Sequence, residues 1–283
     1  MGFKSVEDAA VAASLAMLLE VSANPKAGNV DREHEFEDLK YEHFLASSVA
    51  SLPVFIEVAK RKKIGEGIYK AVKYSKNWYK ATNVHFGAYL LLIPLLTAWD
   101  CKDVFEATRT AVENLKKTTF EDSILILRAF EICKARVMKT DELSLGSDKT
   151  EMELIDKKIN VYEWMSKAPE ENIIAKELTN GYKISLNGAE FILNSELDVN
   201  ERIVFLYHYL LSKYLDPLVI AKAGIKKAEE VRSLAEKAIK SDNPFKKFKE
   251  LDEKLISMNL NPGTIADLVI SSIYLAIFKG WRF

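Results

Sequence analysis

Apolar residues recur at intervals of three and four along most of the chain, and no segment alternates long enough to predict a β-sheet. In the first such pattern, Ala9, Ala13 and Met17 predict a helix from Val6 to Val21, with Ser5 and Asp8 as a capping box. The same spacing predicts helices over residues 41–61, 65–75, 84–97, 102–116, 120–139, 150–166, 170–180, 182–193, 200–214, 225–240, 244–258 and 264–278. We therefore expect an all-α fold, a bundle of roughly a dozen helices.

The breaks between these patterns indicate how the chain is organised. Glycine and proline are scarce, 11 and 7 residues, and most of them stand at the helix joints. Residues 140–149 form a polar stretch that marks a possible boundary between two halves. Because the candidate site residues described below fall in both halves, we expect residues 1–283 to form one domain with its site at the helix joints.

Composition narrows the classes of partner. The net charge of −1 gives no general attraction to nucleic acid or to anionic membranes. The longest apolar runs, 86–99 and 268–278, are shorter than the roughly 20 residues of a membrane span, and the N-terminus has no signal-peptide pattern. Cys101 and Cys133 lack metal or disulfide spacing, which indicates free thiols. We expect a cytoplasmic protein with no nucleic-acid or membrane partner, and a homodimer is compatible with the sequence.

The most informative segment is residues 20–32, where the first helical pattern gives way to EVSANPKAGNVDR. Glu20 and Asp31 are carboxylates of the kind that bind Mg²⁺ together with substrate phosphates. Lys26 and Arg32 can neutralise phosphate charge, and Gly28 allows close approach of the backbone to a ligand. A solvated loop, with no such site, is the alternative.

A second polar cluster, Asn83-Val-His85-Phe-Gly87, stands before an apolar helix. Asn83 is a suitable cap for that helix, and a lone histidine such as His85 is commonly a buried structural residue. The functional interpretation instead places both at a positive helix N-terminus that faces an anion.

Two further clusters lie in the second half of the chain. In Asp216-Pro217, the aspartate is a natural N-cap for a short helix that contains Lys222 and ends at Gly224. In residues 261–267, NPGTIAD, Thr264 and Asp267 have the spacing of a capping box, and the turn before them is also a possible anion site. Asn261 and Gly263 belong to that turn.

Together the four clusters resemble the triphosphoribosyl-dephospho-CoA synthase family, in its archaeal-type branch, over about residues 10–278. Residues 20–32 are similar to the family signature E-V-x-x-x-P-K-P-G-x-V-D-R, and residues 261–268 are similar to its closing N/S-P-G-x-x-A-D-L. Residues 83–87 and 216–224 are weaker matches to its middle motifs. Three positions depart from the pattern: Ala27 replaces a frequent proline, Phe86 replaces a lysine, and 129–143 lacks a Gly-rich stretch.

The resemblance implies an all-α transferase that uses ATP with Mg²⁺. The 2′-hydroxyl of 3′-dephospho-CoA attacks C1′ of the ATP ribose, adenine leaves, and the triphosphate stays on the transferred ribose. A carboxylate can stabilise the oxocarbenium-like state, as in glycosidases, and a second group can take the hydroxyl proton. The expected catalytic residues are Asp216, Glu20 and His85; the expected metal ligands are Asp31 and Asp267; the expected nucleotide and phosphate contacts are Lys26, Gly28, Arg32, Asn83, Lys222, Asn261, Gly263 and Thr264.

Two alternatives remain at this stage. One is a transferase of the same fold that uses ATP with a different acceptor. The other is a non-catalytic helical protein that binds nucleotides. The three interpretations differ in whether the four clusters converge in space, because a catalytic site requires it.

Overall fold

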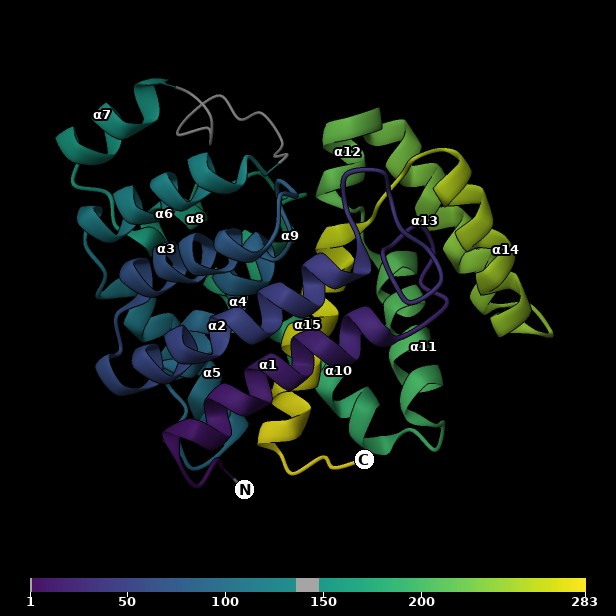
Figure 1. The fold of residues 1–283 in the computed structure, drawn as a ribbon, viewed down its shortest axis with the longest axis horizontal. Coiled ribbons are helices and arrows are strands. Elements are labelled where there is room, and N and C mark those ends of the chain that lie inside the picture. Colours follow the sequence, from purple (N-terminus) through teal and green to yellow (C-terminus); the bar gives the residue numbers. More distant parts are fainter. Residues whose placement is uncertain (1, 136–147) are drawn as a thin grey trace.

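Fifteen α-helices account for most of the computed structural model, which describes residues 2–135 and 148–283 (Figure 1). The helices are α1 (Val6–Ser22), α2 (Tyr41–Arg61), α3 (Ile64–Ser75), α4 (Phe86–Leu96), α5 (Val104–Lys116), α6 (Phe120–Cys133), α7 (Asp148–Asp156), α8 (Val161–Ser166), α9 (Ile173–Asn180), α10 (Lys183–Asn194), α11 (Val199–Lys213), α12 (Pro217–Ala223), α13 (Ile225–Ile239), α14 (Pro244–Ser257) and α15 (Gly263–Phe278). The described residues contain no strand. The predicted all-α class is confirmed.

Two predicted helix ranges were wrong. The range 150–166 is two helices, α7 and α8, because Lys158 has a positive φ of 50° and Asn160 starts α8 with a capping box to Glu163. The range 120–139 is too long, because Lys134 adopts a left-handed conformation that ends α6. The predicted polar stretch at 140–149 lies outside the described residues except for its last two, which belong to α7.

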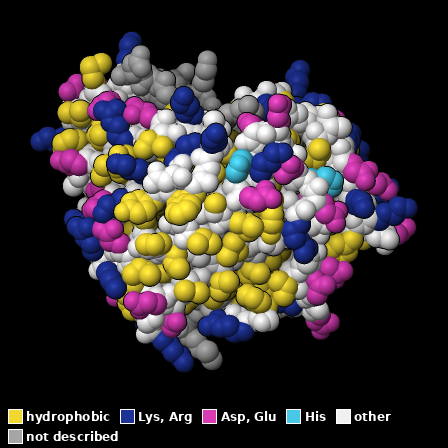
Figure 2. Space-filling model, viewed as in Figure 1, with side chains coloured by type: hydrophobic (Ala, Val, Ile, Leu, Met, Phe, Trp, Pro, Cys, Tyr) yellow, Lys and Arg dark blue, Asp and Glu magenta, His cyan; other side chains and the backbone are white. Residues whose placement is uncertain are grey.

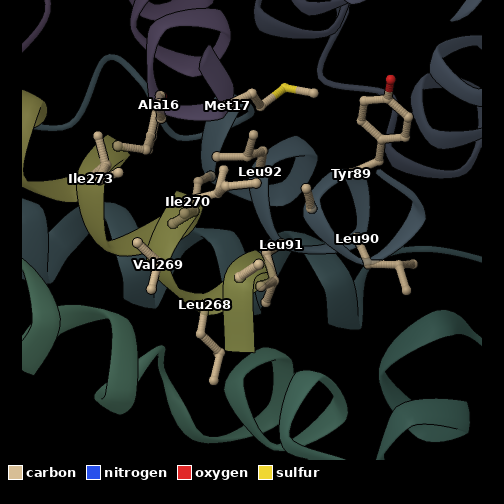
Figure 3. Packing of buried hydrophobic residues seen from close by; sticks show 14 of the residues in the cluster. Ala16, Met17, Tyr89, Leu90, Leu91, Leu92, Leu268, Val269, Ile270 and Ile273 are labelled. Carbon is tan, nitrogen blue, oxygen red and sulfur yellow. The ribbon is translucent and has the colours of Figure 1, made fainter. Parts of the chain in front are cut away.

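Helices α4 and α15 form the centre of the fold. Every residue of α4 is buried, and α15 is buried along nearly its whole length. Figure 3 shows Leu91 and Leu92 of α4 and Ile270 of α15 packed together beneath Ala16 and Met17 of α1. An α-helix that is apolar on all sides is stable in water only when other elements surround it. This burial fixes the N-termini of α4 and α15, where the second and fourth polar clusters stand.

One face of the molecule is unusually apolar. Figure 2 shows hydrophobic side chains gathered over α1 and α2. Val11 of α1 is 45% exposed, and Val49 of α2 is 63% exposed. Within the described ranges, no single helix has both the length and the apolar character of a membrane span. The bent pair α11 and α12 meets those criteria of length and composition only when the two are counted together.

Candidate active site

The first polar cluster is a buried ion pair. In the loop between α1 and α2, the ammonium of Lys26 is fully buried and donates to Glu20 Oε1 at 2.5 Å, Asn29 Oδ1 at 3.0 Å and the Val30 carbonyl at 3.1 Å. These three acceptors match the three protons of the ammonium. Burial, together with the nearby charge of Asp31, raises the pKa of Glu20, and the charge of Lys26 opposes that rise. A solvated loop would expose these groups. Their burial therefore excludes the solvated-loop alternative for this segment.

Side chains from distant parts of the chain hold the loop in place. Asn200 at the start of α11 donates to the Asn24 carbonyl and accepts from the Asn24 N–H. Tyr207 donates to the Ala27 carbonyl at 2.9 Å, and His208 Nε2 accepts from the Ala27 N–H at 3.3 Å. Asn29 donates to Asn261 Oδ1 at 2.9 Å, which joins the first cluster to the fourth.

Gly28 is needed for the backbone conformation and for close packing, and not for the approach of a ligand that the sequence suggested. Its φ is +72°, and a Cβ atom there would lie 2.4 Å from the Leu260 carbonyl oxygen and 2.7 Å from Leu255. Its N–H donates to Asp252 Oδ1 of α14 at 2.8 Å. The glycine therefore allows the loop to lie directly against α14.

Asp216 connects two helix N-termini. Its Oδ1 accepts from the N–H groups of Leu218 and Val219 in α12, as predicted for an N-cap, and its Oδ2 accepts from Ile265 N–H in α15 at 2.9 Å. The predicted capping box of Thr264 is absent, because α15 begins one residue earlier, at Gly263, and this carboxylate supplies the cap. Burial raises the pKa of Asp216 to about 6, against the effect of these N–H donors.

Asp267 brings the second and fourth clusters together. A Cβ atom on Gly87 would lie 2.1 Å from Asp267 Oδ2, so this carboxylate sits directly on the backbone at the start of α4. Burial of the carboxyl group and the negative charges of Glu20 and Asp216 raise the pKa of Asp267 well above its ordinary value, and the Ala88 N–H opposes the rise. The glycine of the second motif is therefore needed to admit the aspartate of the fourth.

His85 carries a buried imidazole ring. Only 2% of the residue is exposed, and neither ring nitrogen bonds to any described residue. Its ring packs edge-on against Phe44 at 5.0 Å. The neighbouring Asn83 accepts from the N–H of Phe86, the first residue of α4, at 3.2 Å, although His85 and not Asn83 occupies the N-cap position. An unpaired buried polar group is costly, so the two ring nitrogens are candidates for contact with substrate.

The titration of His85 predicts a specific loss of stability in acid. Burial, followed by the charge of Lys26, lowers the pKa of His85 from 6.5 to about 3. Below pH 6.5 the unfolded chain therefore binds a proton on this histidine that the native state does not bind. The free energy of unfolding is unaffected above pH 6.5 and decreases as the pH falls from 6.5 towards 3. Relative to His85→Phe, the wild type should lose about 2 kcal/mol of unfolding free energy by about pH 5. Urea unfolding across pH measures it, and parallel curves for the two proteins contradict it.

A third group of titratable side chains adjoins the loop. His34 Nδ1 lies 2.6 Å from Asp252 Oδ2, and ligand atoms of Asp31, His34 and Asp252 all lie within 4.8 Å of one another. Asp31 also accepts from the N–H groups of Glu33 and His34, which fixes the turn. Thus Asp31, expected to share a metal with Asp267, is grouped with His34 and Asp252.

Arg32 and Lys222 lie at the surface. Arg32 is exposed and donates to Asn200 Oδ1 at 3.3 Å, and Lys222 is exposed and donates to the Asn259 carbonyl. Both lie beside segments that contain the buried cluster, although neither side chain enters it in this structure.

The four separated clusters therefore converge. Contacts and charge interactions connect Glu20 and Lys26 with His85, Asp216 and Asp267, which come from both halves of the chain. The sequence interpretation missed Asn200, Tyr207, His208 and Asp252. One signal was available: Asp252 interrupts the apolar stripe of Phe248, Leu251 and Leu255.

Comparisons with known proteins agree with this arrangement. Residues 6–282 match the family model described as ATP:dephospho-CoA triphosphoribosyl transferase. The chain belongs to this family. Two Streptococcus equi proteins, from subsp. zooepidemicus and subsp. equi and named 2-(5''-triphosphoribosyl)-3'-dephosphocoenzyme-A synthases, are each 26% identical over 98% of both chains. A solved structure from Archaeoglobus fulgidus, carrying the name triphosphoribosyl-dephospho-coA synthase, has a TM-score of 0.73 and 47% identity, and the match covers 84% of this chain and 100% of that one.

These findings confirm the predicted family and enzyme class. They indicate ATP:dephospho-CoA triphosphoribosyl transferase activity, and they favour neither a different acceptor nor a non-catalytic nucleotide-binding protein. The departures at Ala27 and Phe86 leave the family assignment intact. Both residues are buried: Ala27 bonds to α11 through its backbone, and Phe86 packs near Phe130 with ring centroids 6.1 Å apart.

Proposed function

We propose that the buried cluster formed by Glu20, Lys26, His85, Asp216 and Asp267 carries out the family's reaction. The 2′-hydroxyl of dephospho-CoA attacks C1′ of the ATP ribose, the N-glycosidic bond to adenine breaks, and an O-glycosidic bond forms. The proton lost by the hydroxyl balances the proton gained by adenine. The observation that carries the proposal is the convergence of four motifs from distant parts of the chain on one buried group.

The proposed roles follow from what each side chain already contacts. We assign Glu20 as the oxocarbenium stabiliser, because among the described residues its carboxylate bonds to Lys26 alone, and the charge of Lys26 opposes the rise in the Glu20 pKa. Asp216 acts by fixing the N-termini of α12 and α15 around the ribose. His85 is neutral, and a ring nitrogen can accept a hydrogen bond from the attacking hydroxyl.

The residues fit the Mg²⁺ that accompanies ATP. The carboxylates of Glu20, Asp216 and Asp267 interact with one another, and burial, followed by the negative charges of Glu20 and Asp216, raises the pKa of Asp267. The charge of Asp31 acts on Glu20 in the same way. Mg²⁺ prefers oxygen ligands and commonly takes one or two carboxylates plus substrate phosphates. In our proposal Asp267 meets this ion. When bound, Mg²⁺ would neutralise the charge of the triphosphate.

The triphosphate itself needs cations and N–H donors. We propose that Arg32 and Lys222 turn towards it from the surface, and that Asn261, Gly263 and Thr264 present the N-terminus of α15. Asn83 and Gly28 support the site by shaping the backbone, as their contacts indicate. Lys26 acts by holding Glu20 in position.

The domain organisation, the localisation and the oligomeric state are also proposals. We infer that residues 1–283 act as one domain, since the cluster draws on both halves, and that the enzyme works in the cytoplasm, where ATP is available. A homodimer is supported by the apolar face over α1 and α2 (Figure 2), and light scattering will give the mass of the particle.

Release of adenine tests the proposed reaction. The protein incubated with ATP, Mg²⁺ and dephospho-CoA should produce one adenine for each dephospho-CoA modified, measured by liquid chromatography and mass spectrometry. Omitting dephospho-CoA gives the control for ATP breakdown alone. Adenine release that does not depend on the acceptor would contradict transfer.

A further inference from the structure

Asp31, His34 and Asp252 form a separate group beside the proposed site. Asp31 and His34 belong to the loop between α1 and α2, and Asp252 belongs to α14, more than 200 residues later in the chain. One ligand atom from each lies within 4.8 Å of the other two. The group thus joins two segments at the point where Gly28 allows them to touch.

Asp252 gives the second observation, which points to a missing ligand. The residue is 0% exposed, and while its Oδ1 accepts from the Gly28 N–H, its Oδ2 accepts no hydrogen bond from any described residue. His34 Nδ1 lies only 2.6 Å away, yet the two atoms are not aligned as donor and acceptor, and this nitrogen also lacks a hydrogen bond within the described chain. A buried carboxylate oxygen in that condition is costly.

We propose that Asp31, His34 and Asp252 bind a divalent first-row transition-metal ion, of which Mn²⁺ and Zn²⁺ are the representative cases. The buried Asp252 Oδ2 and the His34 Nδ1 lie side by side, and neither atom has a hydrogen bond of acceptable geometry among the described residues, as expected for ligands of one cation. An imidazole nitrogen suits these ions, whereas Mg²⁺ prefers oxygen alone. His34 is 27% exposed, which gives the ion a route from solvent and leaves room for water ligands.

The bound ion ties the loop to α14. The loop carries Lys26, so the ion strengthens the scaffold of the active site without contact with substrate. Asp31 is already fixed by the N–H groups of Glu33 and His34, and its carboxylate oxygens retain lone pairs for a cation. This site does not depend on the proposed reaction, and it is tested without nucleotides.

Metal binding to the full chain provides the test. The protein is stripped with a chelator and titrated with Mn²⁺, Zn²⁺ or Mg²⁺; bound metal is measured by mass spectrometry of the native protein and thermal stability by Tm. We expect one Mn²⁺ or Zn²⁺ per chain and a Tm increase of about 5 °C at ~100 times Kd. Asp252→Asn, which keeps an acceptor for Gly28, and His34→Gln should each weaken binding at least ~10–100-fold.

Matched variants control the test. Glu253→Gln changes an exposed carboxylate on the same helix, and His43→Gln changes another half-buried histidine, so both should bind metal as the wild type does. Circular dichroism checks that Asp252→Asn folds, and His34→Gln keeps the test open if it does not. The proposal is wrong if the wild type retains no transition metal, if Asp252→Asn and His34→Gln bind it unchanged, or if Mg²⁺ binds equally tightly.

Discussion

Replacing Asp267 with asparagine is expected to lower the rate of adenine release from ATP by about 10²–10³-fold. The carboxylate lies on the backbone of Gly87 and is crowded by the charges of Glu20 and Asp216, an arrangement that a cation relieves. Asparagine keeps the shape and an acceptor oxygen but removes the charge that Mg²⁺ requires. The initial rate of adenine release with ATP and dephospho-CoA, measured over a range of Mg²⁺ concentrations, gives the effect.

A matched change separates this effect from a general loss of charge. Asp242→Asn alters an exposed aspartate in the turn between α13 and α14 and should leave the rate unchanged. The higher Mg²⁺ concentration needed by Asp267→Asn distinguishes loss of the metal from loss of folding, which unfolding curves check independently. An Asp267→Asn enzyme with the wild-type rate and the wild-type Mg²⁺ dependence would remove Asp267 from the site.

Lys26→Met should lower the free energy of unfolding by about 3–5 kcal/mol. The methionine has similar length, but the buried Glu20 carboxylate then loses its one ammonium partner, at 2.5 Å, and Asn29 Oδ1 and the Val30 carbonyl lose their donor. Leaving a charge buried and unpaired is more costly than the pair is worth. Urea unfolding at pH 7 measures the loss.

A double-mutant cycle isolates the pair. Glu20→Gln removes the charge, so Lys26→Met should cost much less in a Glu20→Gln background than alone. As a comparison, Lys70→Met removes the surface partner of Glu57 and Glu66 and should cost about 1 kcal/mol or less. Equal costs for Lys26→Met in both backgrounds would show that the ion pair does not stabilise the loop.

The spacing of apolar residues predicted the helices well where local sequence alone determines the helix ends. The range 41–61 agrees with the structure to the residue, because its apolar spacing and flanking polar residues are unambiguous. The break between α7 and α8 was missed because it depends on a left-handed Lys158, a conformation that lysine does not signal. Similarly, Asp216 was recognised as the cap of its own helix, but its bond to α15, 49 positions later, depends on packing.

The candidate site was only partly predictable for the same reason. The motifs identified Glu20, Lys26, His85 and Asp267, which lie at helix joints. They did not identify Tyr207 or Asn200, which stand in an ordinary amphipathic pattern on α11 and contribute by holding the loop. Sequence also assigned Asp31 to a metal shared with Asp267, a role that remains a prediction, whereas its partners in the structure are His34 and Asp252.

The most direct test of the central claim is adenine release by the wild-type enzyme, with ATP and Mg²⁺, in the presence and absence of dephospho-CoA. The proposed function predicts that adenine appears only with the acceptor and in equal amount to a product heavier than dephospho-CoA by one triphosphoribosyl group. An active, folded preparation that leaves dephospho-CoA unmodified while it consumes ATP, or that releases no adenine at all, would contradict it.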